Sequence, residues 1–133
     1  MTTLSTAIPA LTSWRENRGG GRTGMQSVIN VLQNRAKARN TSLYAEAVRP
    51  MQFTSISPPP NMTAAQSEAA KWPLEGDPDY AVAEQMVIQA LAGELPDITG
   101  GATNYYSMSM PTPPVWAASM TETVTIEGQI FFK

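Results

Sequence analysis

The sequence contains no cysteine and no histidine. Without cysteine the chain has no disulfide, no thiol nucleophile and no thiolate ligand for a metal. Without histidine a Ser-His catalytic triad is excluded, as is a zinc hydrolase that depends on imidazole ligands. Carboxylates, lysine, tyrosine and hydroxyl groups remain for hydrolytic chemistry. We therefore predict a function that needs no metal and no cofactor.

Long apolar runs are also missing. No stretch approaches the ~18 apolar residues of a membrane span, and the N-terminus has neither the basic region nor the apolar core of a signal peptide. We expect a protein that is made in the cytoplasm, does not insert into a membrane, and needs another export route for work outside it. The 133 residues suit a single domain over residues 1–133, which we expect to be a monomer.

Charge is distributed unevenly along the chain. Residues 1–50 carry a balance of +5 and residues 51–133 a balance of −7. The two parts could pack together and neutralise each other, or the first could present a basic face to an anionic partner. The basic residues do not interleave with aromatic residues, so nucleic acid is not predicted as a partner.

One short stretch, residues 13–21, combines a carboxylate, two arginines and a glycine run. Glu16 is the only acidic residue among the first 45 and lies between Arg15 and Arg18. Apolar residues at helical spacing predict a helix over residues 3–15 that the glycines end. The helix dipole at this end raises the pKa of a carboxyl group, whereas the arginines lower it. Such a residue is either an ordinary surface charge or a catalytic acid.

The apolar pattern as a whole predicts a mainly helical α+β domain with a small antiparallel β-sheet near the C-terminus. Further helices are expected over residues 24–39, 42–49 and 78–92. Thr23 is the expected N-cap of the first of these, with Gln26 as its capping-box partner.

The helix over 78–92 has signals at both ends. Asp77 is its expected N-cap, Pro78 its first residue and Gly93 its C-cap. Its buried face is expected to consist of Val82, Met86, Ile88, Ala90 and Leu91.

The sequence also predicts the structure of the segments outside the main helices. Residues 51–62 predict a loop, and residues 64–71 a weak helix. Strands are expected over 103–109 and 122–132, the second range forming a hairpin around Glu127-Gly128.

Several motifs follow one another in a specific order. Residues 14–20 read WRENRGG and residues 24–35 read GMQSVINVLQNR; QFT follows at 52–54 and LAGELPDITGGATNY at 91–105. The C-terminal segments PVWAASM and IEGQIFF complete the series. Together they resemble the motifs G-E-A-R-G-E, G-x-x-A-V-A-x-V-x-x-N-R, Q-F-S and D-P-T-G-G-A-T-H-Y of the SleB/CwlJ-type cell wall hydrolases. That family includes spore-cortex-lytic enzymes and phage relatives.

The resemblance implies a lysozyme-like α+β fold and bacterial peptidoglycan as the substrate. The family's catalytic acid falls on Glu16. In a lytic transglycosylase this one residue would protonate the β-1,4 glycosidic oxygen between muramic acid and glucosamine and then deprotonate the 6-hydroxyl to leave an anhydro end. A phage endolysin or virion-associated lysin, reaching the wall by holin-type release or in the phage particle, fits a chain of this kind. A muramidase, or a wall-binding or structural module without catalysis, is the alternative.

Five residues are predicted to bind substrate: Arg18, Gln52, Asn104, Tyr105 and Trp116. Arg18 would hold Glu16, meet anionic groups of peptidoglycan, or remain solvated. Tyr105 would either hydrogen-bond sugar or belong to the core. Trp116 would either stack on a sugar ring or fill the core.

The chain departs from the family pattern in ways that bear on catalysis. The second glutamate of the family is Gly20 here, and its two histidines are Asn104 and Gln129. Amides can hydrogen-bond but cannot titrate at these positions. Glu46 is a candidate for a second acid.

Overall fold

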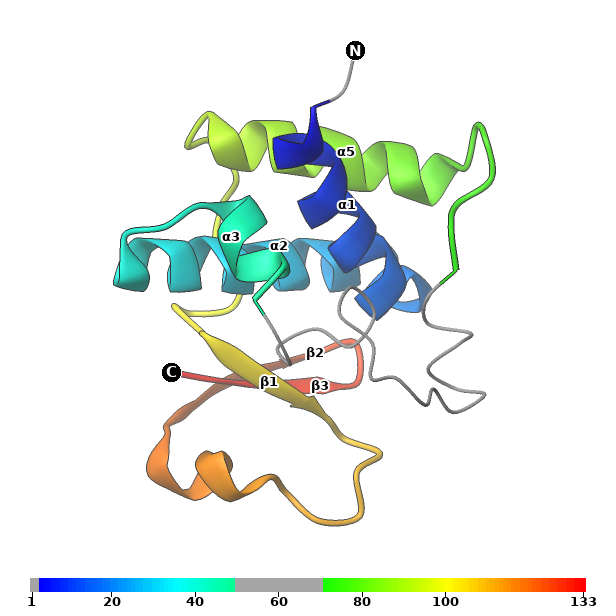
Figure 1. Ribbon diagram of the computed structural model, residues 1–133. Coiled ribbons are helices and arrows are strands. Elements are labelled where there is room, and N and C mark those ends of the chain that lie inside the picture. The colour runs from blue at the N-terminus through cyan, green and yellow to red at the C-terminus, as the bar shows by residue number, and fades with distance from the viewer. Residues whose placement is uncertain (1–2, 50–70) are drawn as a thin grey trace.

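The computed structural model describes residues 3–49 and 71–133. Its elements, in order, are α1 Leu4–Asn17, the 3₁₀ turn η1 Arg18–Gly20, α2 Gly21–Arg39, α3 Leu43–Ala47, α5 Pro78–Leu91, β1 Asn104–Ser107, the 3₁₀ turn η2 Val115–Ser119, β2 Glu122–Ile126 and β3 Gln129–Phe132. In Figure 1 the α-helices lie above the three strands, with α2 between α5 and the sheet. This confirms a mainly helical α+β domain with a small sheet near the C-terminus. The predicted loop over 51–62 and weak helix over 64–71 fall outside the described residues, apart from Lys71.

Helix α2 lies at the centre of the molecule. On one side Met25, Ile29 and Leu32 pack into a buried cluster with residues of α1, α3 and α5. On the other side Val31 packs against Ala102 and Phe131, between α2 and the sheet. Burial of these side chains supplies the main favourable free energy of the fold. None of the helices in the described ranges has the length and apolar character needed to cross a membrane.

The start of α2 differs from the prediction. The helix begins at Gly21, and Gly20 is its N-cap without any side-chain hydrogen bond. Gly21 has φ +67°, a left-handed value that glycine adopts without strain, so the chain passes directly from η1 into α2. Thr23 therefore lies within the first turn, and its prediction as N-cap is wrong. Gln26 instead donates from Nε2 to the carbonyl oxygen of Pro96 at 3.0 Å.

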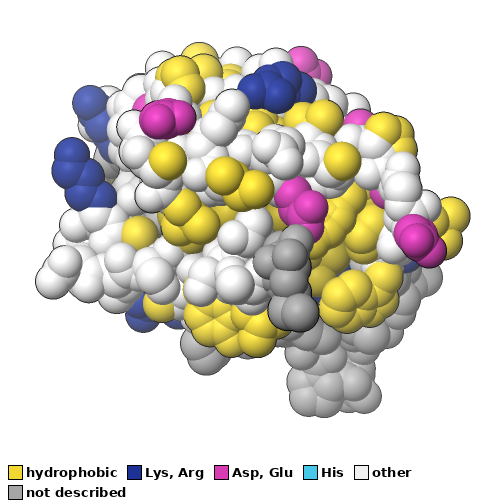
Figure 2. Space-filling view, turned by 90° about the horizontal axis from the view of Figure 1, so that it is seen from above, with side chains coloured by type: hydrophobic (Ala, Val, Ile, Leu, Met, Phe, Trp, Pro, Cys, Tyr) yellow, Lys and Arg dark blue, Asp and Glu magenta, His cyan; other side chains and the backbone are white. Residues whose placement is uncertain are grey.

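Helix α5 begins as predicted, but its buried face is partly different. Asp77 caps the helix by accepting a hydrogen bond from Tyr80 N at 2.9 Å, and Pro78 is the first residue. The buried residues of α5 are Ala83, Met86 and Val87. Ile88 and Leu91 are 49% and 52% exposed, so their predicted burial is wrong. Figure 2 shows hydrophobic side chains exposed on the face seen from above.

The sheet is antiparallel with the order β1-β3-β2. Its register pairs Tyr105 with Phe131 and Thr125 with Ile130. Glu127 and Gly128, the two residues between β2 and β3, have φ values of 45° and 79°. Two successive left-handed residues form the tight turn that suits a two-residue hairpin, which confirms the predicted hairpin.

Candidate functional site

Glu16 lies in the last turn of α1, immediately before η1. It is partly buried. This burial raises the pKa of Glu16 to about 7, because the charged form loses solvation. Near neutral pH the carboxyl group is then present in both protonation states, as a group that acts as an acid and then as a base requires.

Each of the two arginines beside Glu16 contacts other parts of the chain. Arg15 donates from Nε to the carbonyl oxygen of Lys71 at 2.7 Å, and its guanidinium lies 4.7 Å from the ring centroid of Trp72. Arg18 lies 3.9 Å from the ring centroid of Trp14 and donates to the carbonyl oxygen of that residue at 3.2 Å. Arg18 therefore stacks on Trp14. The raised pKa of Glu16 has burial as its cause.

Trp14 anchors the end of α1 that carries Glu16. Its side chain is only 4% exposed. Its indole Nε1 donates to Oδ1 of Asp77 at 3.2 Å. Since Asp77 also caps α5, one carboxylate links the end of α1 to the start of α5. This contact fixes the last turn of α1, and Glu16 with it, against the helical layer.

Tyr105 is the predicted substrate-binding residue whose phenol is within range of the charge of Glu16. Its ring packs against Phe131 with a centroid distance of 5.2 Å and contacts both buried clusters. Burial raises the pKa of Tyr105 well above its ordinary value, the charge of Glu16 acts in the same direction, and that of Arg35 opposes it. Tyr105 is thus a neutral phenol close to both Glu16 and Arg35.

Hydrogen bonds from α2 hold the loop that precedes Tyr105. Asn34 donates from Nδ2 to Asp97 Oδ2 at 3.0 Å and to the carbonyl oxygen of Ala102 at 2.9 Å. Arg35 donates from Nε to the carbonyl oxygen of Thr103 at 2.6 Å. Motifs about sixty residues apart in the sequence therefore meet in space.

Asp97 stabilises the same loop through hydrogen bonds within it. It accepts hydrogen bonds from the backbone N–H groups of Thr99 and Gly101 and from the hydroxyl of Thr99. Burial raises the pKa of Asp97, but these bonds and the one from Asn34 outweigh it, so that the pKa lies below its ordinary value. The carboxylate therefore organises the turn that places β1.

The other predicted binding residues lie apart from one another. Asn104 is partly buried and lines a cavity with Arg35 and Arg39. Trp116 packs edge-on against Tyr106 and Phe132, at centroid distances of 6.0 and 5.4 Å. Successive strand residues point to opposite faces, so this cluster lies on the sheet face away from Tyr105. The predicted Gln52 falls outside the described residues.

Glu46 is not a second acid. It is fully buried and forms ion pairs with Arg39 at 2.7 Å and Arg49 at 2.9 Å. Burial acts to raise its pKa, but hydrogen bonds from Arg49 and Thr41 and the charges of both arginines outweigh it, so the pKa of Glu46 lies below its ordinary value. A carboxylate held ionised in this way does not donate a proton near neutral pH, and the suggested acid role is wrong.

Asn17, which the sequence analysis did not single out, fills the space beside Gly20 and Gly24. A Cβ atom on either glycine would lie 2.8 Å from an atom of the Asn17 amide. The Nδ2 atom of Asn17 is buried without a hydrogen-bond partner in the described part of the chain. The signal for this was available, because the G-E-A-R-G-E motif has alanine at position 17 and glutamate at position 20. This chain carries its larger polar side chain at 17 instead.

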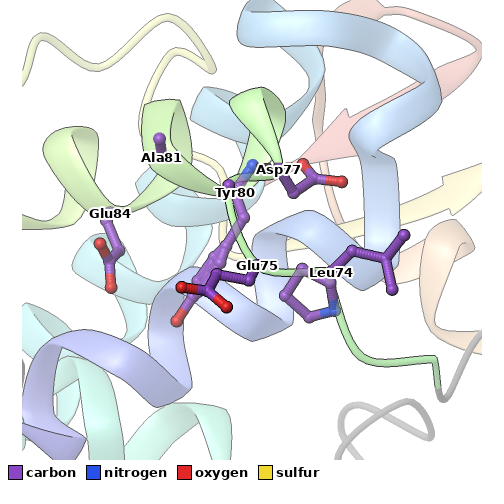
Figure 3. A pocket seen from close by; sticks show the side chains of 8 residues that line it. Leu74, Glu75, Asp77, Tyr80, Ala81 and Glu84 are labelled. Atoms are coloured by element: carbon purple, nitrogen blue, oxygen red, sulfur yellow. Dashed lines mark hydrogen bonds between the residues drawn. The ribbon is translucent and has the colours of Figure 1, made fainter.

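A separate acidic cavity of about 300 Å³ lies at the start of α5. Figure 3 shows Glu75, Tyr80 and Glu84 around it, while the carboxylate of Asp77 points away from these three. Burial raises the pKa of Tyr80, and the neighbouring Glu84 acts in the same direction. None of the predicted site residues within the described ranges lines this cavity.

Comparisons with solved structures identify the fold. The catalytic domain of the germination-specific lytic transglycosylase SleB from Bacillus anthracis is similar with a TM-score of 0.71 and 21% identity, over 100% of this chain and 97% of that one. The catalytic domain of the Bacillus cereus SleB protein is similar with a TM-score of 0.71 and 23% identity, over 99% of this chain and 91% of that one. At these identities the likeness concerns the fold.

Comparison of the sequence identifies the family. No curated protein matches the chain. The model of the family described as Cell Wall Hydrolase matches residues 19–132, so the matched segment starts shortly after Glu16 and includes the loop of Asp97 and all three strands. The chain therefore belongs to the cell wall hydrolase family, which confirms the family that its motifs predict.

Proposed function

We propose that this chain is a peptidoglycan lytic transglycosylase in which Glu16 is the catalytic acid and base. The observation that carries the proposal is the raised pKa of Glu16, about 7, in the last turn of α1. A general acid works best when its pKa is close to the working pH. Membership of the cell wall hydrolase family supports a wall glycan as the substrate. The fold shared with a germination-specific lytic transglycosylase supports the transglycosylase reaction.

The reaction can run through this single carboxyl group. Protonated Glu16 donates its proton to the glycosidic oxygen as the bond from the muramoyl C1 to that oxygen breaks. The resulting carboxylate then removes the proton from the 6-hydroxyl of the same muramoyl residue as its oxygen bonds to C1. Glu16 ends protonated, as it began, and the product is a 1,6-anhydro end. A second carboxylate is not required, in keeping with the ionised and fully paired state of Glu46.

Tyr105 fits the role of a neutral hydrogen-bond donor next to Glu16. Its phenol stays protonated because burial and the charge of Glu16 raise its pKa. A neutral donor next to the acid can orient sugar oxygens without adding a negative charge that would raise the pKa of Glu16 further. Delivery to the wall in a phage particle or by holin-type release remains a prediction from the sequence.

Mass spectrometry of the fragments released from purified sacculi tests the proposal. We expect anhydro-muramoyl ends from the wild-type protein and a loss of release of about 10²–10⁴-fold in Glu16→Gln. Reducing muramoyl ends would instead identify a muramidase. Binding to sacculi without release, unchanged in Glu16→Gln, would identify a non-catalytic wall-binding module.

A further inference from the structure

The three tryptophans of the chain lie in different environments. Trp14 is buried, with 4% of the residue exposed, and Trp116 packs against Tyr106 and Phe132. Trp72, in contrast, is 72% exposed. Exposed tryptophan rings are enriched where a protein binds a ligand, because the ring offers a large apolar face to a partner. The indole of Trp72 is therefore accessible to a ligand from solution.

Arg15 holds the ring of Trp72 in place. Its guanidinium lies over the ring, 4.7 Å from the centroid, and its Nε donates to the carbonyl oxygen of Lys71 at 2.7 Å. The first contact covers one face of the ring, and the second holds the backbone just before it. With 72% of the residue exposed, the other face is open to solvent. A ring that is already held loses less conformational freedom when a ligand binds.

The same segment lies against the end of α1 that carries the proposed catalytic acid. Arg15 directly precedes Glu16 in the last turn of this helix. One residue earlier, Trp14 donates from Nε1 to Oδ1 of Asp77 at 3.2 Å. Both ends of the segment 71–77 therefore contact this turn. The exposed ring is thus held at the end of α1 at which cleavage is proposed.

A pyranose ring suits this surface. In a β-1,4-linked glycan of glucosamine and muramic acid the ring substituents are equatorial, so each face of the sugar presents axial C–H groups. These groups are apolar and carry a small positive charge, whereas the face of an indole ring is negative. An exposed ring with one open face therefore matches the face of a sugar.

We propose that Trp72 forms a subsite that binds a sugar of the glycan strand by stacking, next to the bond that Glu16 cleaves. The inference rests on the proposed function. A strand contains many sugars, so one sugar can stack on Trp72 while a neighbouring glycosidic bond lies at Glu16. Such a contact is the same before and during bond cleavage. It therefore strengthens binding of the strand without changing the rate of the chemical step.

Initial rates on amidase-stripped glycan strands test the subsite. We expect Trp72→Ala to raise KM about tenfold and to change kcat by less than about twofold. Trp72→Phe keeps an aromatic face and should keep most of the affinity. Leu74→Ala is the matched control, because Leu74 is 83% exposed in the same segment and is not aromatic. An unchanged KM in Trp72→Ala, or an equal rise in Leu74→Ala, would overturn the subsite.

Fluorescence reports on the ring itself, since removal of Trp72 also removes a contact of Arg15. The same strands are titrated into Glu16→Gln, so that little cleavage accompanies binding, and into the double variant Glu16→Gln/Trp72→Phe. Stacking displaces water from the indole, so emission should move to shorter wavelength in the first protein and not in the second. Trp14 and Trp116 are present in both. A shift of equal size in both proteins, or no shift in the first, would overturn the proposal.

Failure of the subsite and failure of the proposed function give different results. The fluorescence titration needs no reaction, so a shift that depends on Trp72 would support the subsite even if the wild-type protein released no fragments. Release of anhydro ends with the same KM by wild type and Trp72→Ala would support the proposed function and overturn the subsite. Melting temperatures of Trp72→Ala and Leu74→Ala check that both are folded, and they should stay close to the wild-type value because both side chains are exposed.

Discussion

A Cβ atom built on Gly20 would lie 2.8 Å from Oδ1 of Asn17 and 2.9 Å from the Cβ atom of Glu127. Real Cβ atoms essentially never approach this closely, so a side chain at position 20 requires a shift. The family motif places glutamate at position 20 and alanine at position 17. Asn17 and the Cβ atom of Glu127 therefore both restrict a side chain at position 20.

Gly20→Ala should destabilise the fold by about 1–3 kcal/mol, the usual cost of overpacking. Asn17→Ala removes the amide that the new methyl group would meet, so the double variant should regain part of the loss. Urea unfolding of the two single variants and the double variant measures this coupling.

Gly19→Ala is the matched control, because its Cβ atom would have nothing within 4 Å. Its free energy of unfolding should change by less than about 0.5 kcal/mol. Additive effects of Asn17→Ala and Gly20→Ala would contradict the packing account.

Glu16→Gln should stabilise the folded protein at high pH. The pKa of Glu16 is raised from 4.5 to about 7 on folding. The folded state thus holds this proton where the unfolded state has lost it, so stability falls as pH rises between these values. The penalty is absent below pH ~4.5 and complete above pH ~7; with allowance for partial exposure it is on the order of 1–2 kcal/mol. Unfolding of both proteins at pH 4 and pH 8 measures it, and an equal difference at both pH values would contradict it.

The rate of strand cleavage should depend on pH through the same group. The pKa of Glu16 is about 7, so its protonated form, which donates the proton, is lost as the pH rises above this value. We expect kcat/KM to fall about tenfold per pH unit on the alkaline side. Initial rates on soluble strands between pH 5 and 9 give the profile. A profile flat through pH 8 would show that the acid has another identity or another pKa.

Asp77→Ala should remove two contacts at once. The residue accepts hydrogen bonds from Tyr80 N in α5 and from the Trp14 indole in α1. Loss of an N-cap costs about 1 kcal/mol, and loss of a buried partner adds a similar amount. Thermal unfolding should therefore show a loss of about 2 kcal/mol, while Asp77→Asn keeps most of the stability.

Asp79→Ala provides the comparison for Asp77, since Asp79 is exposed in the first turn of α5. It should cost only the helix-dipole contribution, about 0.3–1 kcal/mol. If both alanine variants lost the same stability, the hydrogen bonds of Asp77 that link α1 to α5 would not stabilise the fold.

Asn34→Ala should loosen the loop before β1. Asn34 donates to Asp97 and to the carbonyl oxygen of Ala102, so its loss removes one hydrogen bond from each acceptor, while Asp97 keeps those from Thr99 and Gly101. We expect a destabilisation of about 1–3 kcal/mol. Hydrogen exchange should quicken at Gly101 and Ala102, whose amides rely on this turn. Gln26→Ala, which loses one exposed bond to Pro96, should leave these amides unchanged.

Local signals in the sequence predict the elements whose boundaries depend on neighbouring residues. Asp77 and Pro78 define the start of α5, and Glu127-Gly128 defines the hairpin, because caps and tight turns act over two or three residues. The motif comparison also selects Glu16 and Tyr105; the charge of Glu16 acts on the phenol of Tyr105, while their roles at the site stay predictions.

Features that depend on distant contacts could not be predicted in this way. Thr23 is a good capping residue, yet Gly21 starts the helix earlier because of the turn that enters it. Ile88 and Leu91 have helical spacing, but α5 packs through the neighbouring face. The sequence shows only that Glu46 carries a carboxyl group. Its ion pairs with Arg39 and Arg49, which keep it ionised, appear only in the folded structure.

Successive residues of β1 point to opposite faces of the sheet. Tyr105 faces the helices and packs on Phe131, whereas Tyr106 packs with Trp116 and Phe132 on the opposite face. A single-residue insertion between Thr103 and Tyr105 would turn Tyr105 to the opposite face of the sheet and put another side chain on the face toward the helices. An insertion of two residues would restore the original side. The segment that leads into β1 can therefore change length in even steps without rebuilding the site, while odd steps require the site to be rebuilt.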